Sequence, residues 1–148
     1  MRILIIEDDP NKLNSLTSFL DQYSDVEYTY HMSYQSGMRA IISSNFDLLL
    51  LDMSMPVYDV TAHDTGGRPL PLAGRDILFQ LKRKRNVLKA IVVTQYEDFN
   101  GVSLQKLDHT LREEFPENYL GYVYYNITQD NWRRNLETML QNIIRKGY

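Results

Sequence analysis

The sequence predicts an α/β fold in which five strands alternate with five helices, giving a (βα)5 doubly wound, parallel five-stranded sheet. Two apolar runs, Arg2–Ile6 and Phe46–Leu51, are continuous, as expected of strands covered on both faces. Between such runs, apolar residues recur at helical spacing. Five average strands, five average helices and their loops need roughly 125 residues. The 148 residues therefore predict a single domain over 1–148.

The first three units are the clearest. Arg2–Ile6 predicts the first strand, and Asp9 can cap a helix that has Pro10 at its first position. That helix carries an apolar face made of Leu13, Leu16, Phe19, Leu20 and Tyr23. Val26–Tyr30 predicts the second strand, which is rich in β-branched and aromatic residues. The second helix carries Tyr34, Met38, Ile41 and Ile42, and Phe46–Leu51 predicts the third strand.

The remaining units follow after an irregular stretch. Ile77, Leu78 and Leu81 mark the third helix, and Ala90–Val93 predicts the fourth strand. The fourth helix carries Leu104, Leu107, Leu111 and Phe115 and is stopped by Pro116. Leu120–Tyr125 predicts the fifth strand, and Trp132–Ile143 the last helix, with Gly147 as its terminator. The surplus residues are expected in Pro56–Ala73 and around Asp108–Asn118.

Composition excludes several classes of protein. The chain has no cysteine, which excludes disulfide scaffolds, thiolate zinc sites and cysteine nucleophiles. No apolar run approaches the ~20 residues that span a bilayer, and the N-terminus lacks the features of a signal peptide. We therefore expect a soluble, cytoplasmic domain. The net charge of −3 indicates neither a nucleic-acid nor a membrane partner. The basic run Lys82–Arg85 is interpreted as charge at a helix C-terminus.

Acids follow two of the predicted strands. Glu7 and Asp8 end the first strand, and Asp52 ends the third. In an open parallel sheet, ligands bind at the carboxyl ends of the strands. Three converging carboxylates repel one another unless a proton or a cation neutralises them, and Mg²⁺ suits such oxygen ligands. A single acid there is better explained as a solvated loop residue or a helix cap, but three at two strand ends favour a site.

A hydroxyl lies at the same predicted edge. Thr94 closes the fourth strand, where it can contact an oxyanion, although it is also an ordinary β-branched strand residue. Metal-binding acids beside a hydroxyl suggest phosphoryl transfer onto a carboxylate. Aspartate can act as the nucleophile in such chemistry, with Mg²⁺ neutralising the charge that develops.

The segments ILIIEDDP, FDLLLLDMSMP and AIVVT, in a (βα)5 order, resemble the receiver domain of two-component response regulators. The resemblance covers essentially the whole chain. It implies a flavodoxin-like receiver fold with strand order 2-1-3-4-5. It also implies transfer of a phosphoryl group from a histidine kinase phosphohistidine to an aspartate, followed by hydrolysis.

Position by position, the resemblance implies a role for each pocket residue. Glu7 and Asp8 would be the acidic pair, with Asp8 a direct metal ligand, and Asp52 would be the phosphoacceptor. Ser54 would give its backbone carbonyl to the metal, so that the metal site comprises Glu7, Asp8, Asp52 and Ser54. Thr94 would be the switch hydroxyl and Tyr122 the switch aromatic.

The sequence departs from the family pattern at three places. The lysine that receivers carry late in the fifth strand, before a proline, is replaced by Tyr125, and no lysine lies nearby in the sequence. A tyrosine cannot offer the ammonium that pairs with a phosphoryl group. Gln95 follows Thr94 where the family prefers a small residue, and it could narrow access to Asp52. An insertion at about 57–73 separates the third strand from the third helix, as a lid, a partner surface or a tolerated loop.

These features predict a stand-alone signalling domain rather than an enzyme. It would be phosphorylated on Asp52 with Mg²⁺ by a histidine kinase or kinase-like protein, and would act on a separate effector protein. A homodimer or partner contact is expected on the surface of the fourth helix, fifth strand and fifth helix. The alternative is a phosphorylation-independent adaptor with a partly vestigial pocket. A haloacid-dehalogenase-type hydrolase would need a second aspartate where Ser54 stands.

Overall fold

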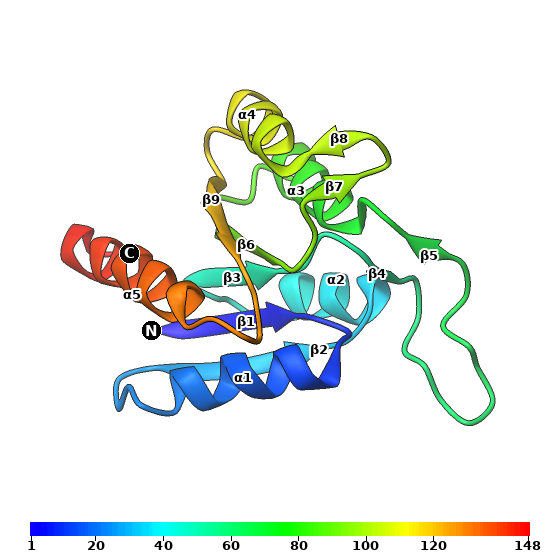
Figure 1. The fold of residues 1–148 in the computed structure, drawn as a ribbon, viewed down its shortest axis with the longest axis horizontal. Coiled ribbons are helices and arrows are strands. Elements are labelled where there is room, and N and C mark those ends of the chain that lie inside the picture. Colours follow the sequence, from blue (N-terminus) through cyan, green and yellow to red (C-terminus); the bar gives the residue numbers. More distant parts are fainter.

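The computed structural model describes all residues, 1–148, and contains one five-stranded parallel sheet with strand order β2-β1-β3-β6-β9 (Figure 1). These strands are β1 (Arg2–Ile6), β2 (Glu27–His31), β3 (Leu48–Leu51), β6 (Lys89–Thr94) and β9 (Tyr119–Tyr124). In chain order they are the first to fifth strands of the sheet. The predicted order 2-1-3-4-5 is therefore confirmed.

Five helices cover the sheet on both faces (Figure 1): α1 (Pro10–Leu20), α2 (Tyr34–Ser43), α3 (Ala73–Arg83), α4 (Leu104–Glu114) and α5 (Asn131–Lys146). Alternate residues of the strands pack on opposite sides. Ile3 and Ile5 face α1 and α5, whereas Leu4 and Ile6 face α2, α3 and α4. Two buried cores therefore enclose the central strands, which explains their continuous apolar sequences.

The predicted ends of the first and last helices are confirmed. Asp9 caps α1, because its Oδ1 accepts hydrogen bonds from the backbone amides of Asn11 (2.9 Å) and Lys12 (3.3 Å). Pro10 occupies the first position of that helix. At the other end of the chain, α5 stops at Gly147, whose φ of 67° is left-handed and suits glycine.

Two small antiparallel hairpins add to the predicted elements. The strands β4 (Met55–Pro56) and β5 (Pro69–Leu70) pair at the base of the predicted insertion, and the loop between them projects away from the sheet (Figure 1). The strands β7 (Asp98–Phe99) and β8 (Val102–Ser103) are joined by Asn100 and Gly101, whose φ values of 53° and 86° are typical of a two-residue hairpin turn.

The second hairpin corrects one prediction. Surplus residues were expected around Asp108–Asn118, but α4 ends at Glu114 and β9 begins at Tyr119, so that connection is short. The extra length lies instead between β6 and α4, in the β7–β8 hairpin. None of the helices combines the length and the apolar character needed to cross a membrane.

Candidate functional site

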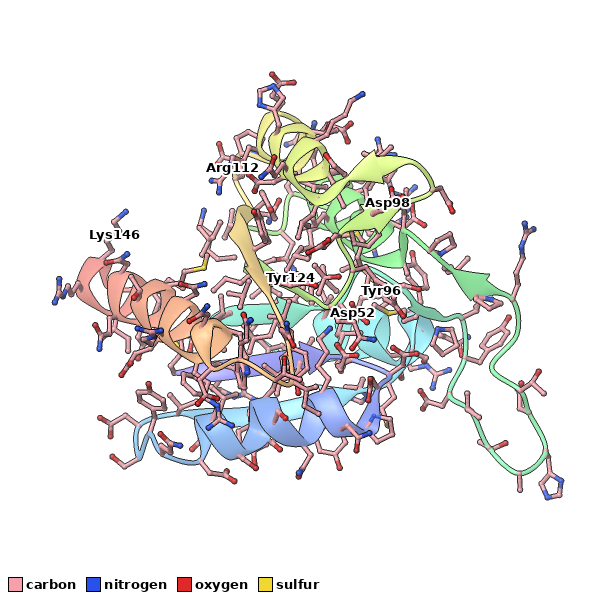
Figure 2. The ribbon with its side chains drawn as sticks, in the orientation of Figure 1. Asp52, Tyr96, Asp98, Arg112, Tyr124 and Lys146 are labelled. Carbon is pink, nitrogen blue, oxygen red and sulfur yellow. The ribbon has the colours of Figure 1, made fainter.

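The three acids predicted at the strand ends lie together in the fold. Because β1 and β3 are parallel neighbours, Glu7 and Asp52 leave the sheet at the same edge, and the amide of Asp52 donates to the carbonyl of Ile6 (3.0 Å). One carboxylate oxygen from each of Glu7, Asp8 and Asp52 lies within 4.8 Å of the others. Glu7 and Asp52 are buried and Asp8 is half-buried. Figure 2 labels Asp52 in the interior of the molecule.

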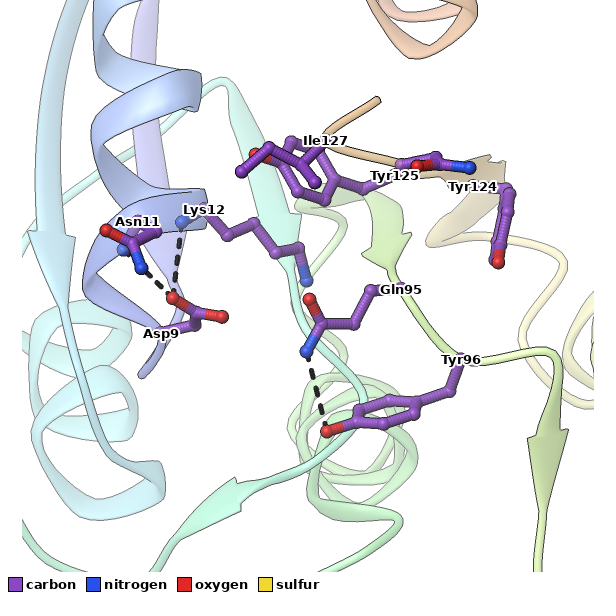
Figure 3. A pocket seen from close by; sticks show the side chains of 9 residues that line it. Asp9, Asn11, Lys12, Gln95, Tyr96, Tyr124, Tyr125 and Ile127 are labelled. Carbon is purple, nitrogen blue, oxygen red and sulfur yellow. Dashed lines mark hydrogen bonds between the residues drawn. The ribbon is translucent and has the colours of Figure 1, made fainter. Parts of the chain in front are cut away.

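The pocket also contains a cation that sequence reasoning missed. The side chain of Lys12, from the first turn of α1, is only 1% exposed. Its Nζ lies 2.7 Å from Glu7 Oε2 and 3.3 Å from Asp52 Oδ1, and it donates a hydrogen bond to the carbonyl of Val93 (2.6 Å). Figure 3 shows this side chain extending from α1. The fifth strand lacks a lysine, but the pocket does not lack an ammonium.

A signal for Lys12 was present in the sequence. Lys12, Leu16 and Phe19 are separated by four and three residues, so they lie on one stripe of the helix. Leu16 and Phe19 are core residues. A lysine on an apolar stripe, at the helix end that adjoins the carboxyl ends of the strands, is expected to direct its ammonium to a buried partner.

Burial and charge together set the ionisation of the pocket. Burial raises the pKa of Glu7, and raises the pKa of Asp8 to about 6 with a further contribution from the Asp52 charge. Burial lowers the pKa of Lys12, but the carboxylates of Asp52 and Glu7 outweigh this effect and raise that pKa above its ordinary value. The ammonium is therefore held in its charged form among carboxylates that it partly neutralises.

Only one oxygen of the Asp52 carboxylate, Oδ1, has close polar partners. Its Oδ1 accepts the backbone N–H of Met53 (2.8 Å) and faces the Lys12 ammonium, whereas Oδ2 accepts no hydrogen bond and is not fully enclosed. The start of α3 packs closely behind it, since the amide of Gly74 donates to the carbonyl of Met53 (2.9 Å). A Cβ at Gly74 would lie 2.6 Å from the Asp52 carbonyl oxygen, so glycine is needed there. No local sequence pattern predicts this role for Gly74.

The other predicted residues occupy the same edge of the sheet. Thr94 ends β6 in a fully buried position, and its Oγ1 accepts the amide of Tyr96 (3.1 Å). Ser54 follows Asp52 by two residues and is half-buried. Tyr122, on β9, is half-buried against the core that α3 and α4 share. Side chains alternate across this strand, because Val123 packs in the opposite core.

Tyr125, at the position where the lysine was expected, makes other contacts. Its hydroxyl lies 2.9 Å from Ser15 Oγ on α1, and its ring centroid lies 5.2 Å from that of Trp132 on α5. It lines a hollow of about 360 Å³ with Lys12 and Gln95 (Figure 3). Gln95 is exposed at this hollow, where its Nε2 lies 3.5 Å from the Tyr96 hydroxyl.

Only the first residues of the insertion lie near the acidic pocket. Ser36 Oγ donates to the Asp59 carboxylate (2.9 Å), which ties the loop to α2. Asp59 and Thr61 line a second hollow, of about 450 Å³, together with Asp8. The rest of the loop is mostly exposed and leads away from the sheet (Figure 1). In this structure the far end of the insertion is not placed over Asp52.

The chain has relatives among known proteins, although no protein-family model matches it. It is 29% identical over 143 residues to the Detocs response regulatory protein DtcB of Enterobacter cloacae (strain JD6301), covering 92% of this chain and 95% of that protein. It is 30% identical over 142 residues to the uncharacterized protein y4jR of Sinorhizobium fredii, covering 90% of this chain and 92% of that one.

Solved receiver structures share the fold. A CheY-like response regulator receiver domain protein from Methanospirillum hungatei JF-1 superposes with a TM-score of 0.65 at 22% identity, over 97% of this chain and 94% of that one. The response regulator TrrA from Thermotoga maritima, solved in complex with Mg(2+)-BeF, superposes with a TM-score of 0.57 at 18% identity, over 93% and 96% of the two chains.

Proposed function

This chain belongs to the receiver-domain family of response regulators, and we propose that it is an atypical single-domain receiver phosphorylated on Asp52 with the help of Mg²⁺. Residues 1–148 would form one receiver unit, with 57–73 as an insertion. The observation that carries the proposal is the position of Asp52. It lies at the carboxyl end of β3, with Glu7 and Asp8 within 4.8 Å and an ammonium 3.3 Å from one oxygen.

The proposed chemistry is the transfer of a phosphoryl group between nitrogen and oxygen. An Asp52 carboxylate oxygen forms a bond to phosphorus while the P–N bond of a phosphohistidine breaks, and the imidazole nitrogen keeps the electron pair. Oδ2 is the favoured nucleophile because Oδ1 is occupied by the Met53 amide and faces Lys12. Attack of water on the phosphorus then releases inorganic phosphate and restores the carboxylate.

The donor atoms of the pocket fit a hard divalent ion. Glu7, Asp8 and Asp52 offer only oxygens, and their three carboxylates exceed the single Lys12 ammonium in charge. Together with the Ser54 carbonyl they would hold Mg²⁺. A bound ion would neutralise the charge that develops on the transferred group. Thr94 would contact the phosphoryl group, and Tyr122 would respond to that contact.

The output would depend on other proteins. A histidine kinase or kinase-like protein would be the phosphodonor and a separate protein the effector. The α4–β9–α5 surface is proposed for a homodimer or for the effector. A hollow of about 440 Å³ lies there, lined by Glu97, Ser103, Leu104, Gln105, Tyr122 and Tyr124. Half-buried tyrosines of this kind are favoured in interfaces.

The test is exposure of the purified chain to phosphoramidate and Mg²⁺, with detection by intact mass. We expect one phosphoryl group on the wild type and none on Asp52→Asn. The matched control is Asp98→Asn, which changes an exposed acid on β7 and should react like the wild type. A wild type that stays unmodified at every donor concentration would reject phosphorylation. That outcome would favour the adaptor alternative, which Tyr125 in place of the expected lysine already supports.

A further inference from the structure

We infer that Lys12 is the residue that binds and neutralises the phosphoryl group on Asp52, in place of the cation that Tyr125 cannot provide. This role rests on the proposed phosphorylation of Asp52. The ammonium lies 3.3 Å from Asp52 Oδ1, and no other lysine or arginine of the chain is buried. A phosphoryl group joined to this carboxylate would extend its oxygens into the space that a flexible lysine side chain can reach.

The ammonium already faces the acceptor to which such a group would be joined. It carries three N–H bonds, and one is used in the hydrogen bond to the Val93 carbonyl. Its remaining N–H bonds face two carboxylates, because Glu7 Oε2 lies 2.7 Å and Asp52 Oδ1 3.3 Å from Nζ. An N–H bond that now faces the Asp52 carboxylate can turn to a phosphoryl oxygen on the same side chain, which is also a strong charged acceptor.

The placement of Lys12 runs against its local preference. A positive charge in the first turn of a helix is disfavoured by the helix dipole, and burial of an ammonium adds a further cost. The Asp9 cap and the Glu7 carboxylate offset both costs. The Glu7 carboxylate also holds the Lys12 side chain toward Asp52. A preorganised, water-excluded cation at this point is the arrangement that stabilises developing negative charge most effectively.

Tyr125 reinforces the assignment. Its hydroxyl contacts Ser15, one turn beyond Lys12 on α1, and its ring packs beside Trp132. Both Tyr125 and Lys12 line the same hollow (Figure 3). Tyr125 is thus a buried residue that packs against α1, the helix that carries Lys12. The positive charge enters the pocket from α1, whereas Tyr125, directly after β9 and at the position where the charge was expected, contacts that helix.

The decisive experiment compares the rates of phosphorylation by phosphoramidate at saturating Mg²⁺. Lys12→Met should react about 10²-fold more slowly than the wild type, as expected when one preorganised charged donor is lost. Lys12→Arg should retain most of the rate. The control Lys106→Met removes an exposed lysine of α4 and should react at the wild-type rate. Mg²⁺ affinity, measured separately by titration, should not fall in Lys12→Met, because this variant loses a positive charge beside the carboxylates proposed to hold the ion.

Two further variants separate a direct role from a structural one. Glu7→Gln/Lys12→Met removes the ammonium together with its buried acid partner, so no unpaired Glu7 charge is left in the interior, and it should be at least as slow as Lys12→Met. A rate that returned to the wild-type value would show that Lys12 serves only to pair with Glu7. Lys12→Met/Tyr125→Lys returns an ammonium from the last strand and should recover much of the lost rate. A purely structural lysine would not be replaced in this way from a different element.

The outcomes also separate this inference from the proposed function. A wild type that accepts phosphate, beside a folded Lys12→Met variant that reacts equally fast, overturns the role of Lys12 alone. A wild type that never accepts phosphate overturns the phosphorylation of Asp52 and, with it, this role.

Discussion

The hydroxyl of Tyr125 lies 2.9 Å from the Oγ of Ser15, which joins the residue after β9 to the middle of α1. The two residues are 110 positions apart in the chain. This contact connects the last strand of the sheet to the helix whose first turn carries Lys12. It also explains how a tyrosine is accommodated at a position where the resemblance to receiver domains implied a lysine.

Loss of this contact is expected to destabilise the fold modestly. Tyr125→Phe and Ser15→Ala should each lower the free energy of unfolding by about 1 kcal/mol. Each substitution removes one hydroxyl of the pair and leaves the other, partly buried, without its hydrogen-bond partner. The double variant should lose little more than either single variant. Urea unfolding of the four proteins measures the coupling, and fully additive losses would show that the two hydroxyls do not interact in solution.

Gly74→Ala should disturb the pocket from behind. The new methyl group would lie 2.6 Å from the Asp52 carbonyl oxygen and 3.1 Å from the Met53 Cα, and these backbone atoms leave little room for adjustment. We expect a loss of about 1–3 kcal/mol in unfolding free energy, as for other overpacked positions. Phosphorylation of Asp52 should also become slower. Arg83→Ala, at an exposed position of the same helix, serves as the control and should change neither property.

Mg²⁺ should stabilise the wild type against heat. A ligand that binds only the folded state adds about 2.7 kcal/mol when present at a hundred times its dissociation constant. Differential scanning fluorimetry should therefore show a melting temperature that rises with Mg²⁺ and returns to its starting value with EDTA. Asp8→Asn should abolish the rise, whereas Asp98→Asn should keep it. An equal rise in both variants would place the ion elsewhere.

Alkaline pH should weaken the fold through Tyr119. Burial and the hydrogen bond to Asp108 (2.6 Å) raise the pKa of this phenol above its ordinary value near 10. The unfolded chain therefore releases the proton first, so the stabilisation is complete below about pH 10 and is lost as the pH rises further. Urea midpoints between about pH 9 and pH 11 should fall more steeply for the wild type than for Tyr119→Phe. Parallel curves would contradict this expectation.

Local patterns predicted most of the fold. The continuous apolar runs of β1 and β3, the Asp9 cap and the Gly147 terminator are signals that lie within a few residues of the feature they predict. The β7–β8 hairpin was missed although its Asn100-Gly101 pair is such a signal, because its two-residue strands are too short to show an alternating pattern.

The acids of the candidate site were predictable for a related reason. Glu7 and Asp52 end strands, and parallel pairing brings strand ends together whatever the loops do. Lys12 was not predicted, because the resemblance to receiver domains implies a lysine at the position of Tyr125 and not on the first helix. The ammonium arrives from α1, and the side chain's direction depends on packing of that helix across the sheet.

The strand order has a consequence for the growing chain. β1 lies between β2 and β3, so the first three strands of the sheet are complete once the chain has been made as far as Leu51. Every charged group proposed to act on the phosphoryl group, from Glu7 to Asp52, lies in this segment or directly after it. β6 and β9 then add in turn at one edge, each pairing with the strand made before it. The sheet can thus assemble in the order of synthesis, with no gap held open for a segment still to come.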